Sequence, residues 1–319
     1  MKISGYVFDQ NNQPMQGIIV SDGMNSVLTD ENGAFILSGW EKAALVYCNI
    51  LTTGSNDWYQ KLSKEKGEYV FHLSPAKSNL ENHTFLHLSD TEIINTTCDC
   101  FLPFVIAKAK ENKASFIMHG GDICGEDAMI RHRKEMSFET VGVPIRYSIG
   151  NHDFLDGAYG EQRYEELYGP IWYSFDIGNI HYVVQSIPKG SGFNSGYTIS
   201  EQYTWLKNNL ENINSNQKVI IFRHDHCAES GDFVVNIENN TYDLPQMGLI
   251  AWIQGHAHTN FAFQTNGVYH VCSSRPDCGG IDNTPASIRL CTIHGTDFTT
   301  KPLFNLPEHD ESSDAVWST

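Results

Sequence analysis

The feature that most constrains this chain is a series of five apolar runs, each followed closely by side chains that can bind a metal. The run Val143 to Ile149 is β-branched and aromatic, as in a buried strand, and it ends at Gly150, where the chain is free to turn. In open α/β sheets, ligands bind beyond the carboxyl ends of strands, so polar side chains there are well placed for chemistry. The five sets are Asp90 with Glu92, then Asp122, then Asn151 with His152 and Asp153, then His224, and finally His256 with His258.

Each set has an ordinary explanation when it is taken alone. Asn and Asp are common turn residues, and a single His after a strand is unremarkable. Five such sets in succession are hard to explain by hydrogen bonding within a core. Together they offer carboxylate oxygen, amide oxygen and imidazole nitrogen, a mixture that suits manganese, iron or zinc better than calcium.

The rest of the pattern divides the chain in two. Residues 1–74 read as short strands separated by turn signals, which predicts a small all-β sandwich. A polar stretch with one proline follows at 74–79. Strands and helices then alternate, with strands predicted at 84–89, 115–119, 143–149, 218–222 and 249–253, and helices at 100–110 and after a cap at Ser200. We therefore predict an α+β fold with domains at residues 1–76 and 80–319.

Composition limits the partners of the chain. Its 319 residues carry 38 acidic against 21 basic side chains, a net charge of −17, so we expect no binding to a nucleic-acid backbone. The sequence has neither a run long enough to span a membrane nor the h-region of a signal peptide, which predicts a soluble, cytoplasmic protein that does not bind membranes. Its eight cysteines lack zinc-site spacing and are expected to be reduced thiols.

Some polar residues are expected to be structural. His87, His119 and His181 lie within strand-like runs, which favours packed or hydrogen-bonded histidines. The cluster from Arg131 to Lys134 could face a substrate phosphate, but a solvated helix face is the better interpretation.

Two resemblances follow from these motifs. The first quarter of the chain, with its order Gly-x-Val, Pro-x-x-Gly and Thr-Asp-x-x-Gly-x-Phe, resembles prealbumin-like (carboxypeptidase-regulatory-like) domains that precede catalytic domains, and we favour a packing role over a carbohydrate-facing one. The remainder resembles the calcineurin-like metallophosphoesterase superfamily. The matching motifs are Asp90-Thr91-Glu92, Gly121-Asp122, Gly150-Asn151-His152-Asp153, His224 and Gly255-His256-Ala257-His258.

The second resemblance implies a four-layer α/β/β/α sandwich that holds two divalent metal ions. Asp122 would bridge the ions, Asp90 and His258 would hold one, and Asn151, His224 and His256 would hold the other. His152 would protonate the leaving oxygen, oriented by Asp153. His224 is favoured over His226 as the ligand because it directly follows the strand and Arg223. The metals would be manganese, iron or zinc, with magnesium as a further candidate.

One position departs from the family pattern. Glu92 stands where the family has His, and we predict that it binds the ion held by Asp90 and His258; the alternative is that it points away and water takes its place. An oxygen-rich set would favour manganese, magnesium or iron(II) over zinc.

The predicted function is metal-dependent hydrolysis of a small phosphomonoester or phosphodiester, through a dinuclear centre and a metal-bridging hydroxide. The alternative is a non-catalytic scaffold or binding protein of the same fold. A third interpretation makes the N-terminal sandwich the main binding element. The oligomeric state is left open.

Overall fold

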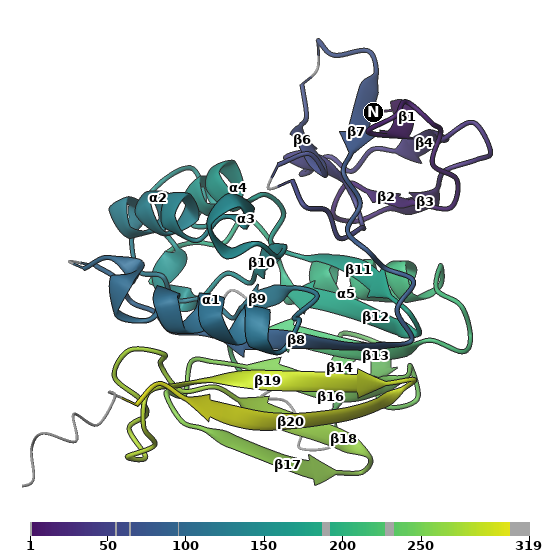
Figure 1. The fold of residues 1–319 in the computed structure, drawn as a ribbon. Coiled ribbons are helices and arrows are strands. Elements are labelled where there is room, and N and C mark those ends of the chain that lie inside the picture. The colour runs from purple at the N-terminus through teal and green to yellow at the C-terminus, as the bar shows by residue number, and fades with distance from the viewer. Residues whose placement is uncertain are drawn as a thin grey trace, which may run out of the picture.

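The structure is a computed structural model that describes residues 2–54, 56–63, 65–94, 96–186, 192–226 and 233–306. Two β-sheets pack face to face in the larger part of the molecule, and a smaller all-β part lies above one end of them (Figure 1). The first large sheet has the order β10 (Ile145–Tyr147), β9 (Ile117–His119), β8 (Asn82–Leu88), β19 (Ser287–His294) and β20 (Asp297–Phe304). The second has the order β11 (Tyr173–Ile177), β12 (Ile180–Gln185), β13 (Lys218–Arg223), β16 (Leu249–Gln254), β18 (Val268–Cys272) and β17 (Phe261–Thr265).

Alternate side chains of these strands point into two different cores. Between the sheets lie aromatic rings from both, among them Phe85 stacked on Phe116 at 4.8 Å and Tyr182 stacked on Phe222 at 5.9 Å. The outward-facing side chains Leu86, Ile117 and Ile221 belong to the other core. This core also includes buried residues of α1 (Leu102–Glu111) and α5 (Ile199–Leu210). Strands that are buried on both faces read as nearly continuous apolar runs, which is why they could be found in the sequence.

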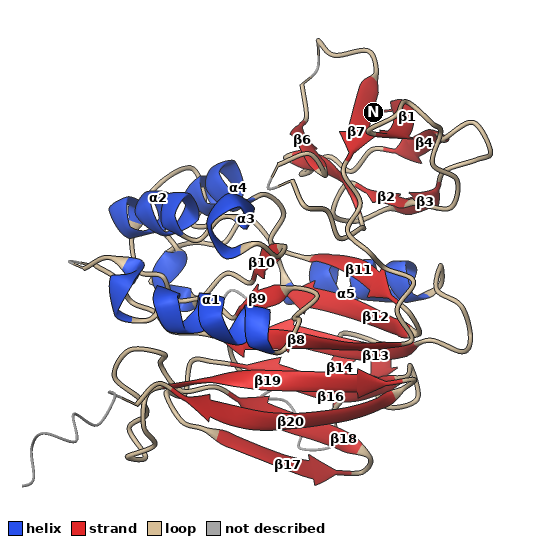
Figure 2. Ribbon diagram, viewed as in Figure 1, coloured by secondary structure: helices blue, strands red, loops and turns tan. Residues whose placement is uncertain are grey.

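Helices therefore cover both outer faces of the paired sheets (Figure 2). This arrangement confirms the predicted four-layer α/β/β/α fold. The other elements of this part are α2 (Glu126–Glu135), α3 (Phe138–Val141), α4 (Gln162–Tyr168), the hairpin β14 (Val234–Ile237) and β15 (Asn240–Asp243), and the 3-10 turns Cys98–Cys100 and Asn151–Asp153.

The N-terminal part is all-β, as predicted. One sheet has the order β4 (Ala34–Ser38), β1 (Lys2–Asp9) and β7 (Tyr69–Leu73), and the other has β3 (Ser26–Leu28), β2 (Ile19–Ser21), β5 (Leu45–Cys48) and β6 (Tyr59–Lys61). The proposed division into domains at residues 76–80 stays a prediction.

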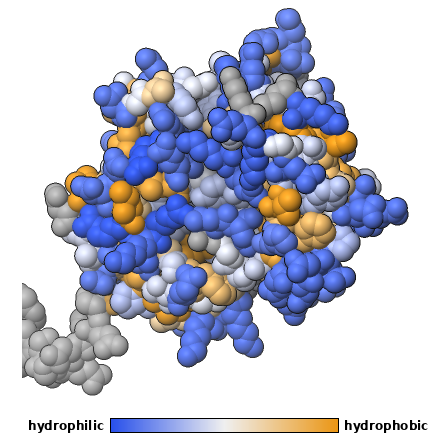
Figure 3. Space-filling model, turned by 90° about the horizontal axis from the view of Figure 1, so that it is seen from above, coloured by the Kyte–Doolittle hydropathy of each residue, from blue (hydrophilic) through white to orange (hydrophobic). Residues whose placement is uncertain are grey.

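Buried hydrogen bonds fix the N-terminal part to the rest of the molecule. The Tyr47 hydroxyl donates to the carbonyl of Trp172 at 2.8 Å, and the Trp172 indole N–H donates to the carbonyl of Gly23 at 2.8 Å. The side-chain oxygen of Asn49 accepts from the backbone N–H of Ser174 at 2.8 Å. Such bonds between buried partners hold the two parts in one orientation. Seen from above, the surface of the molecule is mainly hydrophilic, with separate apolar patches (Figure 3).

Two local predictions are wrong. Helix α5 begins at Ile199 and is capped by Thr198, because Thr198 and Glu201 form a reciprocal capping box that Ser200 cannot form from inside the helix. In α2, His132 is fully buried rather than solvated. It lies on the inner face of the helix, with its ring 4.7 Å from that of His119. Its charged neighbours in the sequence lie on the other faces.

The described histidines and cysteines of the core behave largely as predicted. His87, His119 and His181 are buried and hydrogen-bonded, for example His181 to Asn209 at 2.7 Å, so their structural assignment is confirmed. The seven described cysteines are free thiols, and Cys227 lies outside the described residues. Within the described chain, each helix is too short or too polar to span a bilayer.

Helix α4 contains a carboxyl group with a shifted pKa. Glu165 is 6% exposed, and burial raises its pKa to about 7, although the hydroxyls of Tyr159 and Tyr197 donate hydrogen bonds that act in the opposite direction. The nearby carboxylate of Glu161 adds a smaller rise. Folding above neutral pH must therefore bury this group in its charged form.

We expect Glu165 to lower the free energy of unfolding as the pH rises. Below the ordinary pKa of 4.5 the group is protonated in both states; as the pH rises through the folded pKa near 7, the stabilisation is lost. The full loss amounts to about 3 kcal/mol. In the wild type, urea unfolding should give a lower free energy of unfolding at about pH 7.5 than at about pH 5. The difference between the two pH values should be smaller in Glu165→Gln. If the free energy of unfolding changed equally with pH in both proteins, Glu165 would not be the source of the change.

Candidate metal centre

The candidate centre forms where strands of both large sheets end. Strands β8, β9 and β10 are parallel, so Asp90, Asp122 and Asn151 follow them at the same edge of the first sheet. Strands β13 and β16 are parallel in the second sheet and lead to His224 and His256. Residues that are far apart in the sequence thus meet at one end of the paired sheets.

The loops bring the predicted ligands into two groups that share one carboxylate. Asp122, His224 and His256 form the first group, and Asp90, Asp122 and His258 form the second; in each group the ligand atoms lie within 4.8 Å of one another. Asp90 and Asp122 are buried, with exposed fractions of 0% and 1%. A shared, buried carboxylate between two imidazole-containing groups is an arrangement that can hold two metal ions side by side.

His224 is oriented toward the shared carboxylate. Its Nδ1 lies 2.7 Å from the carbonyl oxygen of Gly120, which fixes the proton on that nitrogen and leaves Nε2 as an acceptor in the neutral ring. Nε2 is buried and lies 3.1 Å from Oδ2 of Asp122, but among the described residues it makes no hydrogen bond. When its ring is neutral, a histidine held in this way presents the lone pair of Nε2 to the space between the two groups.

The charges around the centre favour a cation. Burial by itself disfavours protonated His224, but the carboxylates of Asp122 and Asp90 outweigh it and raise its pKa to about 10. Contact with Asp90 at 3.3 Å raises the pKa of His258 as well. Burial alone would raise the pKa of Asp122, yet its contact with His224 lowers it. The carboxylates therefore draw positive charge into the site, and a divalent ion meets the same demand.

Asn151 supplies an amide oxygen with no partner. Its Oδ1 is buried and makes no hydrogen bond in the described structure. An unsatisfied buried carbonyl costs free energy, which a metal ligand bond would offset. Its neighbour His152 is exposed, and the His152 backbone N–H donates to Oδ1 of Asp122 at 2.9 Å. The chain thus has donors that fit divalent ions, with an exposed imidazole beside them.

Five residues of the centre adopt left-handed backbone conformations, which non-glycine residues rarely do. Such conformations persist only where the surrounding structure imposes them, and they cluster at functional sites. They are Asp90 (φ 57°), Glu92 (φ 41°), Asp122 (φ 56°), His256 (φ 61°) and His258 (φ 48°).

Glycines allow the loops to come this close. A Cβ atom at Gly150 would overlap the carboxylate of Asp122, and one at Gly255 would overlap the hydroxyl of Ser89. The glycines of the Gly-Asn-His-Asp and Gly-His-Ala-His motifs are therefore required by the close approach of neighbouring loops.

Asp153 holds two of these loops together. Its carboxylate accepts hydrogen bonds from the backbone N–H groups of Asp122, Ile123, Cys124 and Gly150, at 2.8 to 3.0 Å. All four of these bonds go to the backbone, and none goes to the imidazole of His152. Asp153 therefore fixes the loop that carries Asp122, and its role in orienting His152 stays a prediction.

Glu92 lies at the centre and has a partner that the sequence did not reveal. Its Oε1 is 3.2 Å from Nε2 of His258, and its other oxygen is bound by the guanidinium of Arg275, which also pairs with Asp277 at 3.1 Å. Arg275 follows β18 at a position with no motif around it. Glu92 thus keeps one oxygen on the side of His258.

The two neighbouring histidines after β13 differ in position. His224 belongs to a ligand group, whereas His226 is exposed, with its ring 6.4 Å from that of His270. The structure therefore brings His224, the favoured residue, to the other predicted ligands.

Comparisons with family models identify the class of this fold. A family model described as calcineurin-like phosphoesterase matches residues 83–260, and one described as the N terminal of calcineurin-like phosphoesterase matches residues 1–76. The first match covers more than half of the chain. The chain belongs to the calcineurin-like phosphoesterase family, which confirms the resemblance in the sequence.

Solved structures give distant matches. A dimetal phosphatase from Danio rerio is 15% identical, with a TM-score of 0.47 over 69% of this chain and 95% of that chain. An archaeal phosphodiesterase is 14% identical, with a TM-score of 0.37 over 69% and 99% of the two chains. GAP50 of Plasmodium, described as the anchor in the inner membrane complex, is 12% identical, with a TM-score of 0.47 over 70% and 84%. No curated protein sequence matches this chain.

Proposed function

We propose that this protein hydrolyses a small phosphomonoester or phosphodiester with the help of two divalent metal ions. The observation that carries the proposal is the pair of ligand groups that share Asp122. Asp90 and His258 would hold one ion together with Asp122, and His224, His256 and Asn151 would complete the other. Manganese, iron and zinc are the metals that this mixture of donors suits.

Each part of the centre has a chemical task. Bound ions supply Lewis-acid activation of water and of the phosphoryl group. His152 would donate a proton to the leaving oxygen, which is supported by its exposure and by the hydrogen bond from its backbone N–H to Asp122. Asp153 would keep the Asp122 and Asn151 loops at the distance that the centre requires.

A scaffold of the same fold is the competing function. A scaffold has no use for an exposed proton donor beside a buried set of ligands, so His152 favours the enzyme. The N-terminal part is tied to the rest by buried hydrogen bonds, which supports a packing role for it.

Hydrolysis of two generic esters tests the proposal. p-Nitrophenyl phosphate and bis-p-nitrophenyl phosphate report monoesterase and diesterase activity, and each rate should be lost on chelation and restored by manganese, iron or zinc. Metal binding without hydrolysis of either ester, or of a panel of natural phosphate esters, would favour the scaffold instead.

Glu92 gives a prediction about one of the two ions. If its free oxygen completes the Asp90 group, Glu92→Ala should weaken binding of that ion by about 10–100-fold, while Glu92→His should restore a ligand and shift preference toward zinc. Arg275→Gln is the matched control, because it removes the ion pair and keeps the carboxylate. Metal titration of the three variants is the measurement. Wild-type affinity and metal preference in Glu92→Ala would show that Glu92 serves only to pair with Arg275.

A further inference from the structure

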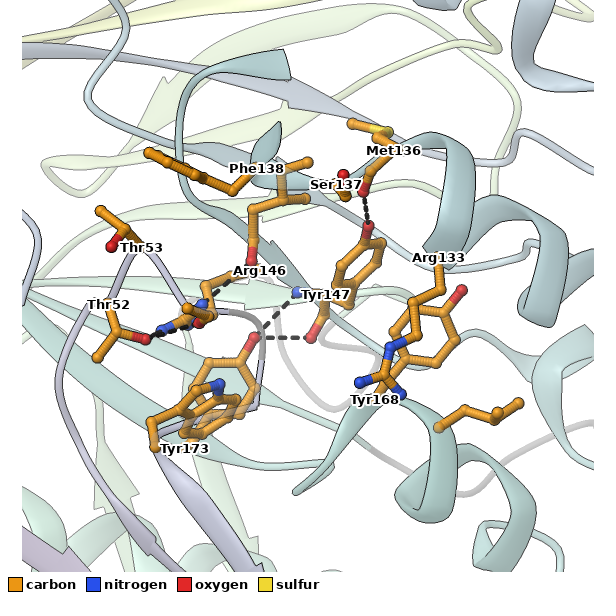
Figure 4. A pocket seen from close by; sticks show the side chains of 14 residues that line it. Thr52, Thr53, Arg133, Met136, Ser137, Phe138, Arg146, Tyr147, Tyr168 and Tyr173 are labelled. Carbon is orange, nitrogen blue, oxygen red and sulfur yellow. Dashed lines mark hydrogen bonds between the residues drawn. The ribbon is translucent and has the colours of Figure 1, made fainter. Parts of the chain in front are cut away.

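A cavity lined by aromatic, aliphatic and basic side chains lies apart from the metal centre, between the N-terminal part and the helices α2 to α4. It has a volume of about 40 Å³ and opens to solvent. Its walls come from the segment around Thr52 and Trp58, from α2 and from β10 (Figure 4). Two arginines, Arg133 and Arg146, line it on either side of Tyr147. We call it the arginine cavity.

Arg146 is a buried cation with only neutral partners. It is 3% exposed, and its guanidinium donates to the carbonyls of Ile145 and Ile50 and to the hydroxyl of Thr52, at 3.1 to 3.3 Å. Its Nε is buried and has no hydrogen-bond partner in the part of the chain that the structure describes. The guanidinium lies 4.7 Å from the centre of the Trp58 ring. Burial lowers the pKa of this group, but an arginine stays charged in proteins.

Arg133 brings a second cation to the same cavity from α2. Its guanidinium bonds the amide oxygen of Asn56 and lies 6.0 Å from the centre of the Tyr168 ring. Among the described residues, no carboxylate lies within 4.0 Å of either arginine. By contrast, Arg163 and Arg275 each pair with two carboxylates.

The acidic groups near the cavity are already engaged. Asp57, whose charge acts on Arg146, accepts hydrogen bonds from the hydroxyl of Thr52 at 2.7 Å and from the backbone N–H of Ser74 at 2.9 Å. A buried charge without an ionic partner is costly unless something else neutralises it. The chain has 38 acidic residues, and a carboxylate could neutralise this charge, but the described cavity wall contains none.

We propose that the arginine cavity binds a small oxyanion of the size of phosphate or sulfate. Holding one water takes roughly 10–15 Å³, so a cavity of about 40 Å³ accommodates a group of a few heavy atoms. Arg146 would supply a buried positive charge in the cavity wall, and Arg133 would add a second, more accessible charge from α2. Guanidinium groups are the side chains best suited to oxyanions.

The site would act separately from the metal centre, although β10 links them. Arg146 lies within β10, and the same chain runs on through Gly150 to Asn151. Arg146 also bonds Ile50 and Thr52 of the N-terminal part. An anion bound there would add contacts between these segments and stabilise the folded protein by mass action.

Sulfate is the probe for the test, because it is not a product of phosphoester hydrolysis. Isothermal titration of the full chain with sodium sulfate, at an ionic strength held constant with chloride, should give one site per chain. The site should persist in Asp122→Asn, which is designed to disable the metal centre, and thus does not depend on the proposed function. Arg133→Gln should weaken sulfate binding by about tenfold or more, since a charge-assisted hydrogen bond is lost.

Lys134→Gln is the matched control: it removes the same charge from the next position of α2, outside the cavity wall. It should bind sulfate as the wild type does. Arg146→Gln should behave like Arg133→Gln, and if it fails to fold, the half-exposed Arg133 decides the question alone. Absence of a sulfate site in the wild type, or equal affinities in Arg133→Gln and Lys134→Gln, would overturn the proposal.

Discussion

Asp122→Asn should reduce phosphoesterase activity to the background of the assay and release bound metal. Asp122 is the carboxylate common to both ligand groups, and it is buried between His224 and Asp90. The substitution keeps the size of the side chain but removes its charge. We expect metal affinity to fall by more than the roughly 10–100-fold that is typical of residues that only support a ligand.

The fold should tolerate this change. Asn retains an oxygen that can accept the hydrogen bond from the His152 backbone N–H. Removing one charge also reduces repulsion from the buried carboxylate of Asp153. Asp127→Asn is the matched control, because Asp127 is exposed on α2 and belongs to neither ligand group. Full metal content and normal turnover in Asp122→Asn would refute the shared-ligand role.

His152→Ala should leave metal binding intact and slow hydrolysis of esters with poor leaving groups by roughly 10²–10⁴-fold. An alkoxide needs a proton as it departs, whereas p-nitrophenolate hardly does. The loss should therefore be much smaller for p-nitrophenyl phosphate than for an alkyl phosphate.

The comparison of the two esters separates a proton donor from a residue that only shapes the loop. His294→Ala is the control, because His294 is an exposed histidine at the end of β19, outside both ligand groups. An equal loss on both esters would contradict the proton-donor role of His152, and a loss of metal would indicate that the residue supports the ligands.

The strands that carry the centre could be predicted because they are buried on both faces. Runs such as the one at 218–222 are apolar without interruption, and the structure places β13 at Lys218–Arg223. The same logic indicated that the polar residues following these strands are well placed for a site, since ligands bind beyond the carboxyl ends of strands. Asp122 and His224 follow strands of different sheets, and it was the family resemblance that assigned them to one site.

Contacts between distant loops could not be predicted. The Glu92–Arg275 ion pair joins residues 183 positions apart, and nothing around Arg275 marks it as part of a site. The burial of His132 depends on which face of α2 meets the sheet, and the charged residues on either side of it concealed that face. The arginine cavity likewise arises only when the N-terminal part packs against β10 and α2.

The backbone conformations of the centre could not be predicted from the sequence either. The left-handed conformations of Asp90, Asp122 and His256 aim their side chains, but Asp and His occur in many turns without such a role. The four backbone hydrogen bonds to Asp153 could not be predicted either. The motif places this carboxylate next to His152 in the sequence, whereas its hydrogen bonds join two loops.

The most direct test of the central claim is to count metal ions and measure hydrolysis on the same sample. Protein stripped with a chelator is titrated with manganese, iron(II) or zinc, and bound metal and the rate on a generic phosphate ester are followed together. Two ligand groups that share Asp122 predict saturation at two ions per chain, with the rate rising as the second ion binds. Hydrolysis at full rate without bound metal, or two bound ions with no hydrolysis of any phosphate ester, would contradict the account.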